Sequence, residues 1–176
     1  MDNSIAIIVE GAAEEAIINV LLNNDKLIFT RNELIDDGPI RMRKSENFEK
    51  HILDFGFPDT FDIYRVLDSK NEKFKISSAF KFKVGKIVEL YTTPEIEMLF
   101  IVFNNDYDTF TRHRSREKIK PSVFCKQNYH DVGNIKSRED VYNFWNQQPD
   151  ELVAVIREYA RLSSNKRENT LERLLK

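Results

Sequence analysis

The chain has 176 residues, 41% of them hydrophobic, so it is long enough to bury one substantial core and short for two full domains. Its 27 basic and 29 acidic residues leave a net charge of −2, which argues against a protein that coats nucleic acid by bulk positive charge. The single cysteine, Cys125, excludes an internal disulfide and a multi-cysteine zinc cluster. We therefore expect one domain over residues 1–176.

The number of cysteines also indicates the cellular compartment in which the protein is expected. A chain with one cysteine and no recognisable signal peptide is typical of a reducing environment, so we expect a cytoplasmic protein. The apolar runs at 5–9 and 98–103 are far shorter than the about 20 residues that cross a bilayer. We expect no membrane association.

The first half of the chain alternates between strand and helix patterns. A continuous apolar run at 5–9 is typical of a strand buried on both faces, and the spacing of apolar residues predicts a helix at 12–23. A second short strand is expected at 27–29. A helix is expected at 45–55, with Ser45 as its cap, and a strand at 61–67.

The second half begins with a strand and then becomes helical. Residues 86–91 predict a strand, and Thr93 followed by Pro94 predicts the N-cap and first position of a helix. From about residue 115 we expect helices only, with a polar, loose tail at 163–169. The expected helices span 122–129, 138–146 and 150–162. The sequence predicts an α/β fold with a mostly parallel central sheet flanked by helices, and an all-helical part over about 115–176.

Acidic residues occur where the predicted strands end. Glu10 closes the first strand, Asp68 closes the strand at 61–67, and Glu95 and Glu97 follow the strand at 86–91. Glu14 comes four residues after Glu10, in the first turn of a helix. Ligands of parallel sheets bind beyond the carboxyl ends of the strands, and grouped carboxylates suit Mg²⁺ or Mn²⁺. Solvation and the helix dipole also favour acidic residues at such places, so ordinary solvated termini are the competing interpretation.

Three segments carry a resemblance to a known family. The segment Ile7-Ile-Val-Glu-Gly11 followed by Glu14 resembles the first motif of the Toprim superfamily, and residues 66–70 (Val-Leu-Asp-Ser-Lys) take the place of its paired-aspartate motif. Residues 93–99 resemble the Pro-x-x-Glu helix of RloB-like proteins. The chain is thus similar to a superfamily that includes topoisomerase and primase catalytic domains and nucleases of the overcoming-lysogenization-defect type. The closest resemblance is to small stand-alone Toprim-like proteins related to the RloB family of bacterial defence loci.

The resemblance implies a Toprim-like fold and roles for particular residues. Glu10 would be the general acid/base with Glu14 in support, and Asp68 and Glu97 would be ligands of Mg²⁺ or Mn²⁺. The second acidic position of the paired-aspartate motif is Lys70 in this chain, and Glu72 could substitute for it.

A basic cluster follows the candidate acidic site in the sequence. It could follow a nucleic-acid backbone, or it could be a solvated loop and helix face. Its members are Arg112, Arg114, Arg116, Lys118 and Lys120.

Three functional hypotheses follow. The first is a Mg²⁺-dependent nuclease or other phosphodiester-processing enzyme, linked to defence against phages or mobile elements. The second is a catalytically degenerate Toprim-like module that binds a partner ATPase or another effector. The third is a structural or regulatory α/β domain. Divalent-metal binding that depends on Asp68 separates the first from the second.

Overall fold

The computed structural model describes residues 4–55, 60–71 and 74–176. Four strands form one parallel sheet in the order β2-β1-β3-β4. The strands are β1 (Ser4–Val9), β2 (Ile40–Arg41), β3 (Phe61–Leu67) and β4 (Val84–Tyr91). The inner strands β1 and β3 are mostly apolar and mostly buried, as expected for a parallel sheet covered on both faces, although β3 also carries Asp62 and the buried Arg65.

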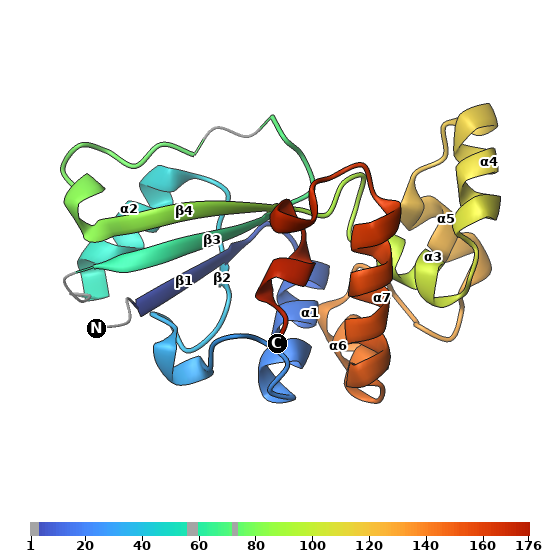
Figure 1. Cartoon of the computed structure of the whole chain (residues 1–176), viewed down its shortest axis with the longest axis horizontal. Coiled ribbons are helices and arrows are strands. Elements are labelled where there is room, and N and C mark those ends of the chain that lie inside the picture. Colours follow the sequence, from blue (N-terminus) through green and yellow to red (C-terminus); the bar gives the residue numbers. More distant parts are fainter. Residues whose placement is uncertain (1–3, 56–59, 72–73) are drawn as a thin grey trace.

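The helices lie on both sides of the sheet and beyond its carboxyl edge (Figure 1). They are α1 (Ala12–Asn23), α2 (Ser45–Phe55), α3 (Met98–Phe103), α4 (Tyr107–Glu117), α5 (Pro121–Asn128), α6 (Arg138–Asn146) and α7 (Pro149–Leu162). The sheet occupies one end of an elongated molecule, and α3, α4 and α5 occupy the other (Figure 1). The predicted fold class is confirmed: a parallel α/β sheet flanked by helices, with helices in the C-terminal part.

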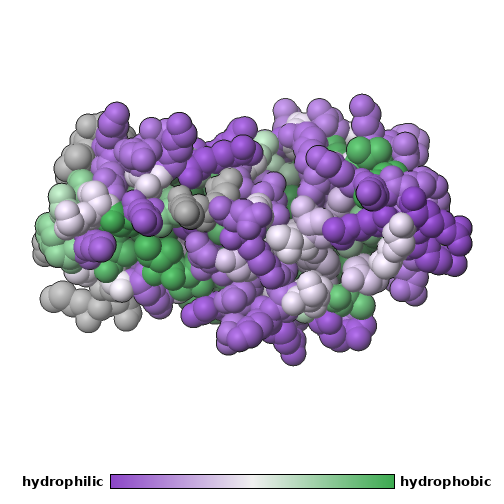
Figure 2. Space-filling model, turned by 90° about the horizontal axis from the view of Figure 1, so that it is seen from above, coloured by the Kyte–Doolittle hydropathy of each residue, from purple (hydrophilic) through white to green (hydrophobic). Residues whose placement is uncertain are grey.

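Successive side chains of each strand point to opposite faces of the sheet, so the sheet separates two hydrophobic cores. Ile7 and Val9 of β1 face the larger core, which contains residues of α1, α3, α6 and α7. Ala6 and Ile8 face a smaller core with Phe48 of α2. Viewed from above, hydrophobic surface gathers in the half of the molecule that holds the sheet (Figure 2).

Aromatic packing ties the C-terminal helices to the larger core. Trp145 of α6 is fully buried, with its ring centroid 5.0 Å from that of Phe144 and 5.2 Å from that of Phe100. Cys125 of α5 is also fully buried. Trp145 thus packs the C-terminal helices together, and Cys125 behaves as a buried apolar residue.

Two local predictions are wrong, each because tertiary contacts override a local signal. Residues 27–29 form no strand: Leu27 makes one antiparallel bridge to Leu175, and the second strand is β2. The helix expected at Pro94 begins at Met98, after a cis Thr93–Pro94 peptide bond. The hydroxyl of Tyr159 donates to the carbonyl of Thr93 and holds that residue outside the helix.

The polar tail contains one buried residue. Asn165 is buried and donates to the Thr93 hydroxyl oxygen at 3.0 Å, whereas residues 164 and 166–168 are exposed. Two short 3₁₀ helices follow, at Arg167–Asn169 and Leu171–Leu174, and the chain ends beside α1 (Figure 1). Over the described ranges, no helix is long and apolar enough to span a membrane.

Candidate phosphodiester site

The carboxyl ends of β1, β3 and β4 bring five carboxylates to one edge of the sheet. Glu10 directly follows β1, Glu14 lies in the first turn of α1, and Asp68 directly follows β3. Glu95 and Glu97 lie in the connection from β4 to α3, and Glu97 is the N-cap residue of α3. Because these strands are adjacent and parallel, their C-terminal connections share this edge. We call these residues the acidic edge.

Burial divides the acidic edge. Glu97 is 1% exposed, Glu10 and Glu14 are each 7% exposed, and Asp68 is exposed. Gly11, in the turn between β1 and α1, leaves room for the carboxylate of Glu14, which a Cβ at this position would displace. Buried carboxylates are costly unless they are protonated or have partners, so this edge must interact with protons or cations.

The electrostatics of Glu14 and Glu97 reflect this burial. Removal from water raises the pKa of Glu14, and the negative charges of Glu97 and Asp68 raise it further, against a backbone hydrogen bond and Lys136. Burial likewise raises the pKa of Glu97, against the hydrogen bond and charge of Lys136. Glu14 therefore feels the charges of both Glu97 and Asp68.

Lys136 is a site residue that sequence reasoning did not identify. It lies in the connection between α5 and α6, and its ammonium group forms an ion pair with Oε1 of Glu97. The neighbouring Ile135 is buried and anchors the connection there. A solitary lysine in a polar loop gives no sequence signal of this contact. The ion pair comes from folding alone.

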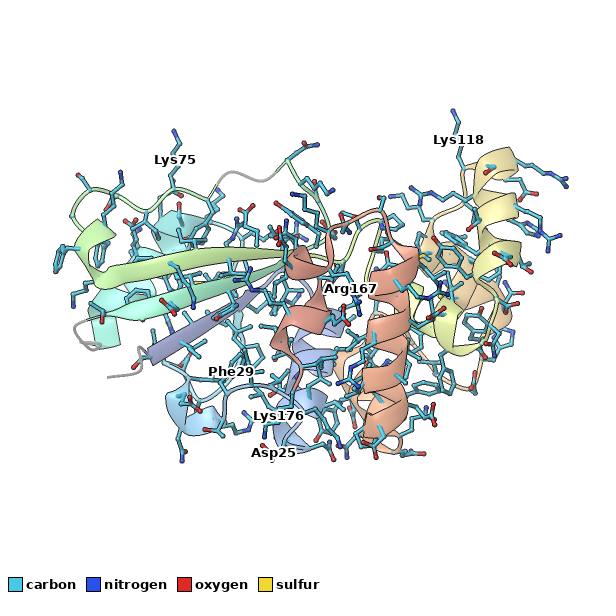
Figure 3. All side chains as sticks on the ribbon, viewed as in Figure 1. Asp25, Phe29, Lys75, Lys118, Arg167 and Lys176 are labelled. Carbon is cyan, nitrogen blue, oxygen red and sulfur yellow. The ribbon has the colours of Figure 1, made fainter. Side chains whose placement is uncertain are left out.

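A groove of about 500 Å³ joins the acidic edge to part of the basic cluster. Asp68 and Glu95 line it together with Arg114, Lys118 and Lys120. Arg114 belongs to α4, Lys118 ends that helix in a left-handed conformation, and Lys120 is the N-cap residue of α5. Lys118 extends outward at the helical end of the molecule (Figure 3). We call this feature the groove.

The rest of the basic cluster does not line the groove. Arg112 and Arg116 are four residues apart on α4 and so share a face that Arg114 does not. The side chain of Arg112 bends back onto its own helix, with Nε 3.4 Å from the carbonyl oxygen of Asp108. The structure thus brings three of the five predicted basic residues to the acidic edge.

Two residues that follow Asp68 in the sequence, Lys70 and Glu72, are not placed at the acidic edge. The ammonium group of Lys70 lies over the ring of Tyr91, 5.4 Å from its centroid, and Lys70 is not among the groove residues. Glu72, the predicted substitute ligand, lies outside the described residues.

The chemistry of the acidic edge fits a hard divalent cation, because carboxylate oxygens are the ligands that Mg²⁺ and Mn²⁺ prefer. Within the described parts of the chain, no three Asp, Glu, His or Cys side chains are already close enough to hold one ion. Glu97 is instead paired with Lys136. Metal binding by Asp68 and Glu97 stays a prediction, and it requires side-chain movement at Lys136.

Comparison with known proteins gives no relative: no family model matches the sequence, and no curated protein or solved structure matches the chain.

Proposed function

We propose that this protein is a Mg²⁺- or Mn²⁺-dependent enzyme that cleaves phosphodiester bonds in nucleic acid. The groove is the observation that carries the proposal, because it puts Asp68 and Glu95 beside the cations of Arg114, Lys118 and Lys120. The cations would hold phosphate groups, while the carboxylates would repel them unless a metal ion lay between. Two signs of charge lining one groove therefore favour metal-assisted phosphodiester chemistry over simple binding.

Each residue has a role set by its position. Asp68 and Glu97 would hold the metal ion, with Glu14 beside them as a supporting carboxylate. A bound Mg²⁺ or Mn²⁺ would supply Lewis acidity and lower the pKa of a water molecule. Glu10, at the end of β1, would act as the general acid/base. Arg114 and Lys118 would bind the backbone of the substrate and orient the phosphate to be cleaved.

The resemblance to Toprim-like proteins supports the same class of reaction. The motif around Glu10 follows a buried strand, and Asp68 follows the neighbouring one. We therefore include in the proposal a Toprim-like nuclease related to the RloB family, acting in the cytoplasm in defence against phages or mobile elements.

A second candidate function rests on a different observation. The ion pair between Lys136 and Glu97 supplies a cation from the chain itself, and Lys70 replaces an expected carboxylate. A catalytically degenerate module that binds an ATPase or another effector would show both features, because it needs no metal ion and can lose a metal-binding carboxylate. In that case metal ions would have no effect on the protein.

The test compares metal binding and nucleic-acid cleavage in matched variants. We expect the wild type to bind Mn²⁺ saturably by calorimetry and to cleave DNA or RNA when Mg²⁺ or Mn²⁺ is present. Asp68→Asn should lose both properties, whereas Glu151→Gln, an exposed change on α7, should keep them. Absence of metal binding at millimolar concentrations would favour the binding module.

A further inference from the structure

A second hollow lies next to the groove, across the first turn of α5. Pro121 lines the groove, and the next residue, Ser122, lines the hollow. The hollow has a volume of about 870 Å³ and lies between α5 and the connection that carries Lys136. We call it the α5 hollow. It opens beside the acidic edge, because Lys136 lines it and also contacts Glu97.

The turn between the two hollows is fixed in place from the acidic edge. The carboxylate of Glu95 accepts a hydrogen bond from the backbone N–H of Ser122 at 2.8 Å. Glu95 thereby caps the start of α5 while it lines the groove. The groove, the acidic edge and the α5 hollow are therefore held together by one short segment of chain.

The lining of the α5 hollow has the chemistry of a nucleotide site. Val123 and Ile135 provide apolar surface, and Val123 is 44% exposed. Lys126 and Lys136 provide positive charge, and the amides of Gln127 and Asn134 provide hydrogen-bonding groups. An apolar surface with a few polar groups and two cations suits a nucleobase with its phosphate.

We propose that the protein binds a single-stranded nucleic acid, with one nucleotide in the α5 hollow and the adjoining part of the strand in the groove. The strand would cross the first turn of α5, so that the phosphodiester between the two parts lies at the acidic edge. This inference rests on the proposed function and deepens it by naming the substrate class. A single strand is favoured because a base must turn its face toward Val123, and in a duplex the faces of the bases are covered by stacking.

The residues that line the two hollows also indicate how the strand is recognised. Among the described residues, no aromatic side chain lines the groove or the α5 hollow, so the bases have no stacking platform. Cations line both parts, with Lys118 on one side and Lys126 on the other. Recognition would therefore depend on the backbone, with little dependence on sequence and a strong dependence on salt.

The test measures binding without cleavage, by fluorescence anisotropy of a labelled ten-nucleotide oligothymidylate in EDTA and again in Ca²⁺. Lys118→Glu tests the groove and Lys126→Glu tests the α5 hollow. Lys75→Glu is the matched control, because Lys75 lies at the opposite end of the molecule (Figure 3). We expect each site variant to weaken binding by about fivefold or more at 0.1 M salt, and the control by less than about twofold. A duplex of the same length should bind at least about tenfold more weakly than the single strand.

A second pair of variants tests the apolar surface. Val123→Asp changes an exposed residue of the α5 hollow, and Phe82→Asp changes one that is 72% exposed before β4. Both positions tolerate a polar side chain because they face solvent. Weaker strand binding by Val123→Asp alone is the expected result. Equal effects of the two variants would overturn the inference.

Two further outcomes separate this inference from the proposed function. If Lys126→Glu binds and cleaves as the wild type does while Lys118→Glu is impaired, the strand does not enter the α5 hollow, and the proposed function stands. If the wild type neither binds nor cleaves any strand, the proposed function fails and this inference fails with it. An equal loss of strand binding in the Lys75→Glu control would show that binding depends only on the overall charge of the protein. That outcome would overturn the proposed nucleotide site in the α5 hollow.

Discussion

Glu97 and Lys136 form an ion pair whose two side chains differ sharply in exposure, 2% for the carboxylate and 58% for the amine. The Lys136 side chain can therefore move away into solvent, whereas the Glu97 carboxylate stays buried. A divalent ion that binds Glu97 must compete with this tethered ammonium group. We predict that Lys136→Met tightens Mn²⁺ binding by about tenfold, or about 1.4 kcal/mol. Calorimetric titration measures the change, with Lys75→Met as the matched control. Unchanged or weaker Mn²⁺ binding would show that the ammonium group does not compete.

Glu14 makes the stability of the metal-free protein depend on pH. Burial raises its folded-state pKa above the ordinary value of 4.5, so the folded protein retains a proton that the unfolded chain releases. This contribution to stability is complete below about pH 4.5 and is lost as the pH rises through the raised pKa. We predict that Glu14→Gln increases the free energy of unfolding at pH 7.5 and flattens its fall above pH 5.

Urea denaturation at several pH values in EDTA measures this dependence. Glu151→Gln, an exposed change on α7, is the control and should leave the pH profile unaltered. A loss of stability in Glu14→Gln at pH 7.5 would mean that hydrogen bonds to the ionised carboxylate outweigh its desolvation.

The turn from β1 to α1 is the element that positions the carboxylate of Glu14. A Cβ at Gly11 would meet the far end of that side chain, which can swing away, and the backbone φ of −125° suits any residue. We predict that Gly11→Ala folds normally but displaces Glu14, and so weakens Mn²⁺ binding and strand cleavage together. Circular dichroism should be unchanged. Gly38→Ala, where the added Cβ would meet no atom closer than 3.4 Å, is the control.

Elements differ in how far local sequence determines them. The helices α6 and α7 follow from apolar spacing and from caps such as Ser137, whose hydroxyl accepts from the N–H of Asp140. The short strand β2 has two residues and only gains its identity by pairing with Ile8 and Val9. The helix α4 contains one buried residue, Phe110, so its apolar pattern is too weak to predict.

At the scale of the whole molecule, the larger core runs without interruption from the sheet to the C-terminal end. It includes Val9 and Val66 of the sheet, Trp145 of α6 and Leu174 near the end of the chain. The carbonyl of Leu174 also accepts from the N–H of Ile28 at 2.9 Å. The sheet and the helical part should therefore unfold together, as the expectation of one domain requires.

This continuity leads to a prediction for the C-terminal end. Leu174→Ala removes a fully buried side chain and should lower the free energy of unfolding by about 2 to 5 kcal/mol. Urea denaturation should show one transition by tryptophan fluorescence and by circular dichroism, at the same midpoint. Two separate transitions would show that the C-terminal helices fold as an independent unit.

The sequence by itself determined the parallel α/β class, because buried strands have continuous apolar runs and helices have apolar residues at helical spacing. It also determined that Glu10, Asp68 and Glu97 follow strand ends, since that depends only on where each run stops. Only the tertiary structure decided that Lys136 pairs with Glu97, and that Arg114 lines the groove while Arg112 does not. These features depend on contacts between distant segments and on the rotation of α4, and no local pattern of residues encodes either of them.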